Sequence, residues 1–278
     1  MINYMNKFTG ILLLLFIFSA CSSSNIIRPG DTIDVAFEKA KNLYDEEKYT
    51  DAANAFETVV SVGRGTDVGQ EAQFLLAESY FKDRRYMLAA AEYERYALFY
   101  PNSSRREMVD FKQGKSYYFL SPRYKLDQTN TRKAIEQFRL FNSRYPNSDL
   151  VTESGELITE LRTKLAKKKF EAANFYMRTD RFQSAVLYYD LVIDDFPETE
   201  WAEKSLVEQI EAYIRYADNS IRSKQPERYR LAIDSYEKYI QLFPRGENRP
   251  KAEDLYDEAA TALEKMGEGI NNLVSSQN

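Results

Sequence analysis

Residues 86–101, YMLAAAEYERYALFYP, decide how this chain folds, because their pattern recurs three more times along it. In this stretch Tyr93 follows Ala89 by four positions, and a second aromatic residue, Tyr100, stands directly before Pro101. The same placements surround three later pairs of alanine and proline: Ala134 with Pro146, Ala185 with Pro197, and Ala232 with Pro244. One repeated unit cannot bury its apolar face alone, so successive units must stack. The pattern therefore predicts an α-solenoid, a fold that presents surfaces to other proteins.

Each unit is predicted to close with an amphipathic helix. Between Tyr86 and Tyr100 the apolar positions recur at three- and four-residue spacing, which is typical of a helix with one buried face. The alanine lets a neighbouring helix approach closely, the aromatic residue fills the groove beside it, and the proline ends the helix. A degenerate first copy lies upstream, with Arg64 in a glycine-rich turn instead of the proline and matching positions at Tyr49, Ala52, Phe56 and Val60.

Each closing helix needs an opening partner to cover its apolar face. We expect opening helices at residues 34–46, 69–82, 104–120, 148–178 and 200–217, and a final capping helix at 250–265. Residues 101–104, followed by Glu107, predict a capping box at the start of the third opening helix. Residues 121–130 and 217–227 are predicted loops. Residues 149–177 contain no proline and a single glycine, which predicts a rod of roughly 40 Å joining three amino-terminal repeats to two carboxy-terminal ones.

Composition argues against most kinds of catalysis. The 278 residues include no histidine, so the commonest general base and the commonest metal ligand are missing. The single cysteine excludes an internal disulfide and a cysteine-rich zinc site. The net charge of −5 argues against a nucleic-acid-binding protein, which would carry a basic stripe. We therefore expect a binding protein with no cofactor and no metal rather than an enzyme such as a peptidoglycan hydrolase.

The amino terminus predicts export from the cytoplasm. Lys7 precedes an apolar run at residues 11–18, which is too short to span a bilayer and is followed by Ser19, Ala20 and Cys21. Residues 18–21 resemble the bacterial lipobox, although that pattern prefers leucine where Phe18 stands. The resemblance implies that Cys21 is lipidated, and serines instead of an acidic residue after it imply the outer membrane. The alternative is an ordinary secretory signal with a stray cysteine.

The alanine, aromatic and proline placements resemble tetratricopeptide repeats, although the tryptophan and glycine of that pattern are absent from most copies. Five such repeats behind a lipobox, with a long linking helix, resemble the BamD family of β-barrel assembly lipoproteins over residues 11–266. The resemblance implies docking on a BamA-like barrel subunit through the carboxy-terminal half, and receipt of unfolded outer-membrane proteins by the amino-terminal half. It implies no catalytic residues. The alternative is another envelope adaptor, serving cell-wall synthesis, gliding or secretion.

These arguments predict an all-α protein, an α-solenoid of about five tetratricopeptide-like hairpins plus a capping helix. We expect a lipoprotein signal peptide at 1–20, a tether at 21–31, repeats one to three at 32–148, repeats four and five with the capping helix at 149–266, and a flexible tail at 267–278. The mature protein would be lipid-anchored on the periplasmic face of the outer membrane.

Two sets of residues are candidate binding sites. Opening helices line the concave face of tetratricopeptide stacks, so aromatic and basic side chains in the first two repeats predict a peptide groove: Phe37, Lys41, Tyr44, Phe74, Phe81 and Lys82. The alternative role for the aromatic residues is packing between repeats. A second basic set flanks the fifth-repeat insertion and predicts a partner contact, with a solvated surface as the alternative: Arg222, Lys224, Arg228 and Arg230. We interpret a further basic run, Lys164 and Lys167–Lys169, as a solvated helix face; the alternative is contact with an acidic partner surface or with lipid headgroups.

Overall fold

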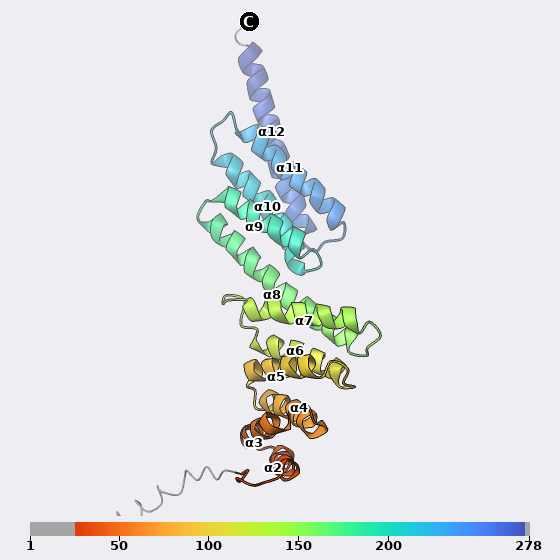
Figure 1. Cartoon of the computed structure of the whole chain (residues 1–278). Helices are drawn as coiled ribbons and strands as arrows, with labels where there is room; N and C mark the ends of the chain where they lie inside the picture. Colours follow the sequence, from red (N-terminus) through yellow and green to blue (C-terminus); the bar gives the residue numbers. More distant parts are fainter. Residues whose placement is uncertain (1–25, 276–278) are drawn as a thin grey trace, which may run out of the picture. The chain divides into compact units, whose positions relative to one another are not determined.

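The computed structural model describes residues 26–275, and within that range the chain contains only α-helices and their connections (Figure 1). The predicted signal peptide and Cys21 lie outside the described residues. The chain divides into two compact units, with unit 1 extending to Ser103 and unit 2 beginning at Ser104. The predicted domain boundary after residue 148 therefore falls inside unit 2. Among the described residues, no helix combines the length and apolar character needed to cross a bilayer.

Unit 1 consists of two helical hairpins: α2 (Ile33–Asp45) with α3 (Tyr49–Gly63), and α4 (Asp67–Lys82) with α5 (Tyr86–Phe99). Within unit 1, α2 packs against α3, α3 against α4, and α4 against α5. Unit 2 adds three hairpins and a last helix: α6 (Arg106–Leu120) with α7 (Thr129–Arg144), α8 (Val151–Arg178) with α9 (Phe182–Asp195), α10 (Glu200–Asp218) with α11 (Gln225–Leu242), and α12 (Arg249–Ser275). The described residues therefore confirm the predicted all-helical hairpin repeats.

The repeated alanines are buried because neighbouring helices approach closely at these positions. All five, including Ala52 of the degenerate first copy, have no exposed surface. The aromatic residue four positions later is likewise fully buried in the first four copies, as Phe56, Tyr93, Phe138 and Tyr189. In the last copy Tyr236 is only partly buried, and its ring stacks on that of Tyr256 of α12 with 4.6 Å between the centroids.

The prolines end the closing helices as predicted. The aromatic residue before each proline is the C-cap, at Tyr100, Tyr145, Phe196 and Phe243, with backbone angles outside the helical region. The turns inside three hairpins each contain a residue in the left-handed backbone region, which the sequence did not predict. Glu47, Arg84 and Asp180 adopt positive φ angles of 59°, 60° and 54°, a region that glycine and asparagine occupy at lower cost.

The predicted capping box at the start of α6 is wrong. Arg105 is the N-cap, and no side chain caps the helix. Glu107 instead accepts a hydrogen bond from the Ser148 hydroxyl at 2.6 Å, within unit 2. Glu107, the acidic side chain of the expected motif, thus bonds to a distant residue rather than to the helix start.

The long helix is confirmed, because the 28 residues of α8 span about 42 Å. Its basic run, however, is not a freely solvated face. All four lysines are partly buried, and two of them bind the loop between α6 and α7. The Lys164 ammonium donates to the Ser121 hydroxyl at 2.8 Å, and the Lys168 ammonium donates to the Leu126 carbonyl at 2.6 Å. At the other end of unit 2, α12 continues to Ser275, beyond the predicted end of the capping helix at 265 and into the predicted tail.

Candidate protein-binding surfaces

The aromatic residues of the predicted peptide groove lie on α2 and α4, and all four are partly buried. Each ring packs against a ring of the closing helix in its own hairpin, at centroid distances of 5.5 to 6.0 Å: Phe37 with Phe56, Tyr44 with Tyr49, Phe74 with Tyr96, and Phe81 with Tyr86. These side chains therefore contribute to hairpin packing and still retain exposed surface. A peptide-binding role for them stays a prediction.

The two lysines of that set differ in their surroundings. The Lys41 ammonium donates to the Asp45 carboxylate at 2.8 Å, and this bond raises the pKa of Lys41. A peptide carboxylate would have to compete with Asp45 for the same ammonium. Lys82 is exposed in the last turn of α4, where a cation also complements the helix dipole. Nearby, burial raises the pKa of the Tyr44 phenol to about 12, with a smaller contribution from Glu78, so Tyr44 is a neutral group at physiological pH.

The structure separates the four basic residues predicted near the fifth repeat. Arg228 lies over the Tyr216 ring at 3.6 Å and also donates to the Tyr216 carbonyl, so it packs within unit 2. The Lys224 ammonium forms an exposed ion pair with Glu227 at 3.4 Å. Arg222 and Arg230 are exposed, and neither makes a hydrogen bond or ion pair with the residues that the structure describes. These two arginines are the members of the set that remain available to a partner.

Unit 2 also contains a groove that the sequence did not reveal. It has a volume of about 380 Å³ and is lined by α7 residues Arg132, Ile135, Glu136, Arg139 and Leu140, with Arg162 and Leu165 of α8. Ile135 is buried, whereas Arg132, Arg139 and Leu140 are exposed. The groove therefore combines an apolar lining with cationic side chains, a composition suited to a partner segment with apolar and acidic residues.

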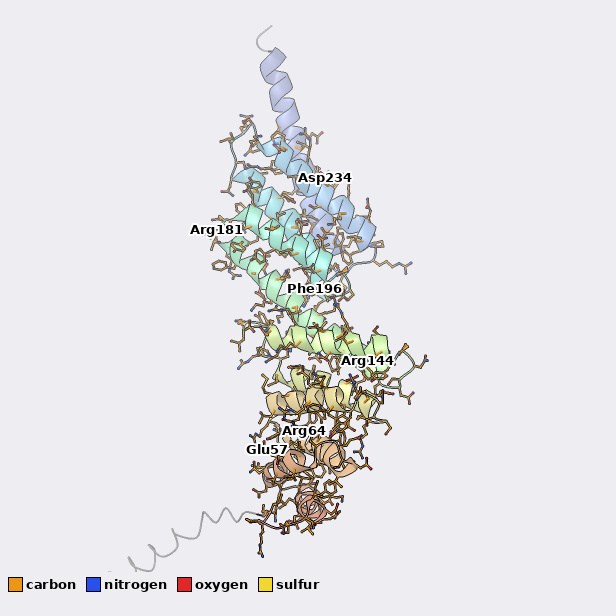
Figure 2. The ribbon with its side chains drawn as sticks, in the orientation of Figure 1. Glu57, Arg64, Arg144, Arg181, Phe196 and Asp234 are labelled. Carbon is orange, nitrogen blue, oxygen red and sulfur yellow. The ribbon has the colours of Figure 1, made fainter. Side chains whose placement is uncertain are left out.

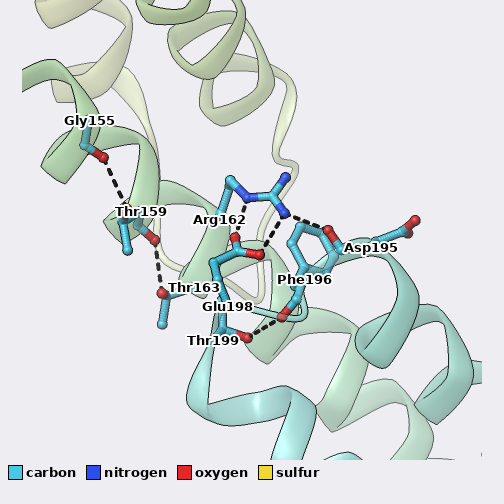
Figure 3. Close-up of polar contacts among 8 residues, drawn as sticks. All are labelled: Gly155, Thr159, Arg162, Thr163, Asp195, Phe196, Glu198 and Thr199. Carbon is cyan, nitrogen blue, oxygen red and sulfur yellow. Dashed lines mark hydrogen bonds and ion pairs between the residues drawn. The ribbon is translucent and has the colours of Figure 1, made fainter. Parts of the chain in front are cut away.

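Arg162 is fixed at one side of this groove (Figure 3). Its guanidinium donates to both carboxylate oxygens of Glu198, one of them at 3.0 Å, and to the Asp195 carbonyl at 2.6 Å. It also lies over the Phe196 ring at 5.1 Å. The hydrogen bonds from Arg162 hold the pKa of the Glu198 carboxyl below its ordinary value. These contacts of Arg162 connect the middle of α8 to the turn between α9 and α10.

The threonines beside Arg162 bond within their own helix. The Thr159 hydroxyl donates to the Gly155 carbonyl at 3.0 Å, and the Thr163 hydroxyl donates to the Thr159 carbonyl at 2.8 Å (Figure 3). Their hydroxyls are thus occupied within α8, whereas Arg162 bonds to the end of α9 and to the turn that follows it.

Residues 30–226 match the model of a protein family described as YfiO, outer membrane lipoprotein. The chain belongs to this family. Over 229 residues it is 24% identical to the outer membrane protein assembly factor BamD of Vibrio cholerae, covering 78% of this chain and 95% of the relative. The BamD of Rickettsia prowazekii is 23% identical over 192 residues, which cover 69% of this chain and 75% of the relative. Among solved structures, a tetratricopeptide-repeat protein of Bacteroides fragilis aligns with a TM-score of 0.45 and 11% identity, covering 83% of this chain and 99% of that protein.

The family match extends from the segment before α2 to the first turn of α11 and so includes all four helices of unit 1. It ends before Arg228 and Arg230, so those two residues lie outside the matched range. Within the described part of the chain, no group of three or more acidic, histidine or cysteine side chains is placed to hold a metal ion.

Proposed function

We propose that this protein is a lipid-anchored scaffold of outer-membrane β-barrel assembly, held on the periplasmic face of the outer membrane through Cys21. The observation that carries the proposal is the match of residues 30–226 to an outer membrane lipoprotein family, with relatives named as assembly factors. Helical hairpins with partly exposed aromatic and basic side chains suit a role in holding other proteins.

The partner of unit 2 would be a BamA-like barrel subunit. The exposed arginines Arg222 and Arg230 and the groove between α7 and α8 offer cations to an acidic surface. Charges at the rim of an interface affect the association rate and its salt dependence more than the buried contacts do. We therefore expect the association to weaken as salt rises.

Unit 1 would receive unfolded barrel proteins in an extended form. The partly buried rings of Phe37, Tyr44, Phe74 and Phe81 would contact apolar side chains of the substrate. A photoreactive group at Tyr44 should crosslink to an unfolded barrel protein. The same group at Met87, which is exposed in the first turn of α5, provides the comparison position.

Depletion and pull-down together test the assembly role. Depleting the protein should lower the amounts of many β-barrel proteins together, and pull-down should recover the barrel subunit. Arg222→Glu with Arg230→Glu should slow association with that subunit, whereas Arg181→Glu, a change at an exposed arginine between α8 and α9 (Figure 2), should not. Normal barrel levels after depletion, with a cell-wall or secretion protein recovered instead, would replace this proposal with a different envelope adaptor.

A further inference from the structure

Three helix ends lie together at one edge of unit 1: the start of α2, the end of α3 and the end of α5. A Cβ atom at Gly63 would lie 2.5 Å from Cδ1 of Ile33, so the end of α3 touches the start of α2. The Arg64 guanidinium lies over the Phe99 ring at 5.5 Å, so the same end of α3 also touches the end of α5. We call this surface the Val62 edge, after the exposed residue near the end of α3; Arg64 is labelled in Figure 2.

The Val62 edge exposes large apolar side chains. Val62 is 69% exposed, Leu98 73% and Phe99 45%, and Val35 in the first turns of α2 is similarly exposed. The opposite edge of unit 1 consists of the two turns inside the hairpins. Those turns are strongly charged, with Glu46, Glu47 and Lys48 in one and Asp83, Arg84 and Arg85 in the other. Four of the six large exposed apolar side chains described in unit 1 lie at this edge, the other two being Met87 and Leu88 at the start of α5. A gathering of this kind is typical of an interaction surface.

The chain enters unit 1 at this same edge. The backbone N–H of Arg28 donates to the Asp31 carboxylate at 2.7 Å, and Lys39 forms an ion pair with that carboxylate at 2.6 Å. These bonds hold residues 28–31 against the start of α2. Between Ile26 and Cys21 there are only five residue steps, which span at most about 18 Å when fully extended. An acyl chain on Cys21 would therefore keep the Val62 edge close to the membrane surface.

We propose that the Val62 edge rests on the lipid headgroup region of the membrane, with Val62, Leu98 and Phe99 entering the interface. This inference rests on the proposed lipidation of Cys21. Tyrosine is enriched in the interfacial region, which suits Tyr100, and phenylalanine and leucine are typical of the apolar face of interfacial elements, which suits Phe99 and Leu98. The Arg64 guanidinium, exposed beside Phe99, is placed to meet lipid phosphates while its stem lies along the apolar surface. The edge thus adds a second, orienting contact to the anchor.

Depth-dependent quenching on the acylated full-length protein tests this contact. Cys21 is the only cysteine, so once it is acylated an introduced cysteine can be labelled uniquely. We would label Leu98→Cys with an environment-sensitive fluorophore and reconstitute the protein into phosphatidylethanolamine and phosphatidylglycerol vesicles containing a spin-labelled lipid. Met87→Cys is the matched control, since Met87 is 52% exposed on the same helix and lies about 16 Å further along its axis, at the charged edge.

We expect the probe at position 98 to be quenched several-fold more strongly than the probe at position 87. Circular dichroism should show both variants folded, because both positions are exposed. Vesicle flotation with equal, weak quenching at the two positions would overturn the edge contact and leave the anchor intact. Failure to float would overturn both. A probe at position 98 that is shielded only in native envelopes, without lipid quenching, would identify a protein cover and contradict the lipid contact.

Discussion

The junction of α3 and α4 allows a sharp test of the packing in unit 1. Thr66, the N-cap of α4, accepts a hydrogen bond from the backbone N–H of Gly69 at 3.0 Å, and its hydroxyl donates to the Gly63 carbonyl at 2.7 Å, which holds the first turn of α4 against the end of α3. A Cβ atom at Gly69 would lie 2.5 Å from the carbonyl carbon of Gly63, and closer still to its oxygen. Ordinary carbon contacts are about 3.5–4.0 Å, so the overlap with the carbon is about 1 Å. The obstacle is backbone, which cannot rotate away as a side chain would.

Gly69→Ala should therefore force the α3–α4 hairpin apart. Overpacking of this kind costs about 1–3 kcal/mol and occasionally more, and contact with backbone places this case at the upper end. Alanine returns about 1 kcal/mol through its better helix propensity. We expect a net loss of about 2 kcal/mol in the free energy of unfolding, seen as a melting temperature lower by roughly 4–8 °C for a chain of this size.

Gly155→Ala is the matched control, because a Cβ atom there meets nothing within 4 Å on the surface of α8. It should raise the free energy of unfolding by about 0.5–1 kcal/mol. Calorimetry or thermal circular dichroism on both variants gives the comparison. A melting temperature for Gly69→Ala equal to that of the unchanged protein would refute the close backbone contact.

Two further substitutions examine unit 2. Arg162→Met removes the guanidinium that lowers the pKa of Glu198. A carboxyl group whose pKa is lowered in the folded state stabilises the fold above its unfolded pKa of about 4.3, and this contribution disappears as the pH falls. The variant should therefore lose about 0.5–1 kcal/mol of unfolding free energy at pH 7, and in urea titrations this loss should shrink below about pH 4. A pH-independent difference would contradict the role of the ion pair. Tyr239→Phe removes a hydroxyl that donates to Glu203 at 2.9 Å, on a buried residue, and should lower the free energy of unfolding by about 1 kcal/mol. The hydroxyl of Tyr236 bonds to none of the described residues, so Tyr236→Phe should change that free energy by less than about 0.5 kcal/mol. Equal effects of the two tyrosine changes would disprove this assignment.

The helices could be predicted from the sequence because their signals are local. The distance from Ala89 to Tyr93 is one helical turn, and the aromatic residue before Pro101 is the observed C-cap. Features that depend on contacts between distant residues were missed or misread. Arg162 and Glu198 are 36 residues apart, so no motif marks the groove beside them.

The misread features have the same origin. Glu107 has the spacing of a capping box, yet Ser148 offers it a hydrogen bond through tertiary contact. The basic run of α8 has the spacing of a solvated face, yet two of its lysines bind the loop between α6 and α7, which the sequence predicted only as an insertion. The candidate groove of unit 1 shows why burial could not be predicted from the sequence. Helical spacing places Phe37 and Tyr44 on one face, but it does not say how much of each ring the next helix covers.

The only tryptophan of the chain makes unit 2 visible to a simple optical measurement. Trp201 contacts the Phe170 ring at 5.0 Å, and the ammonium groups of Lys167 and Lys204 lie over its own ring at 5.3 and 4.7 Å. Its emission therefore reports on the junction of α8 with α10, while the far-ultraviolet dichroism sums the helices of both units. If the emission and dichroism curves coincide during denaturation, the two units unfold together. If the curves separate, each unit has its own denaturation midpoint, measured without any added label.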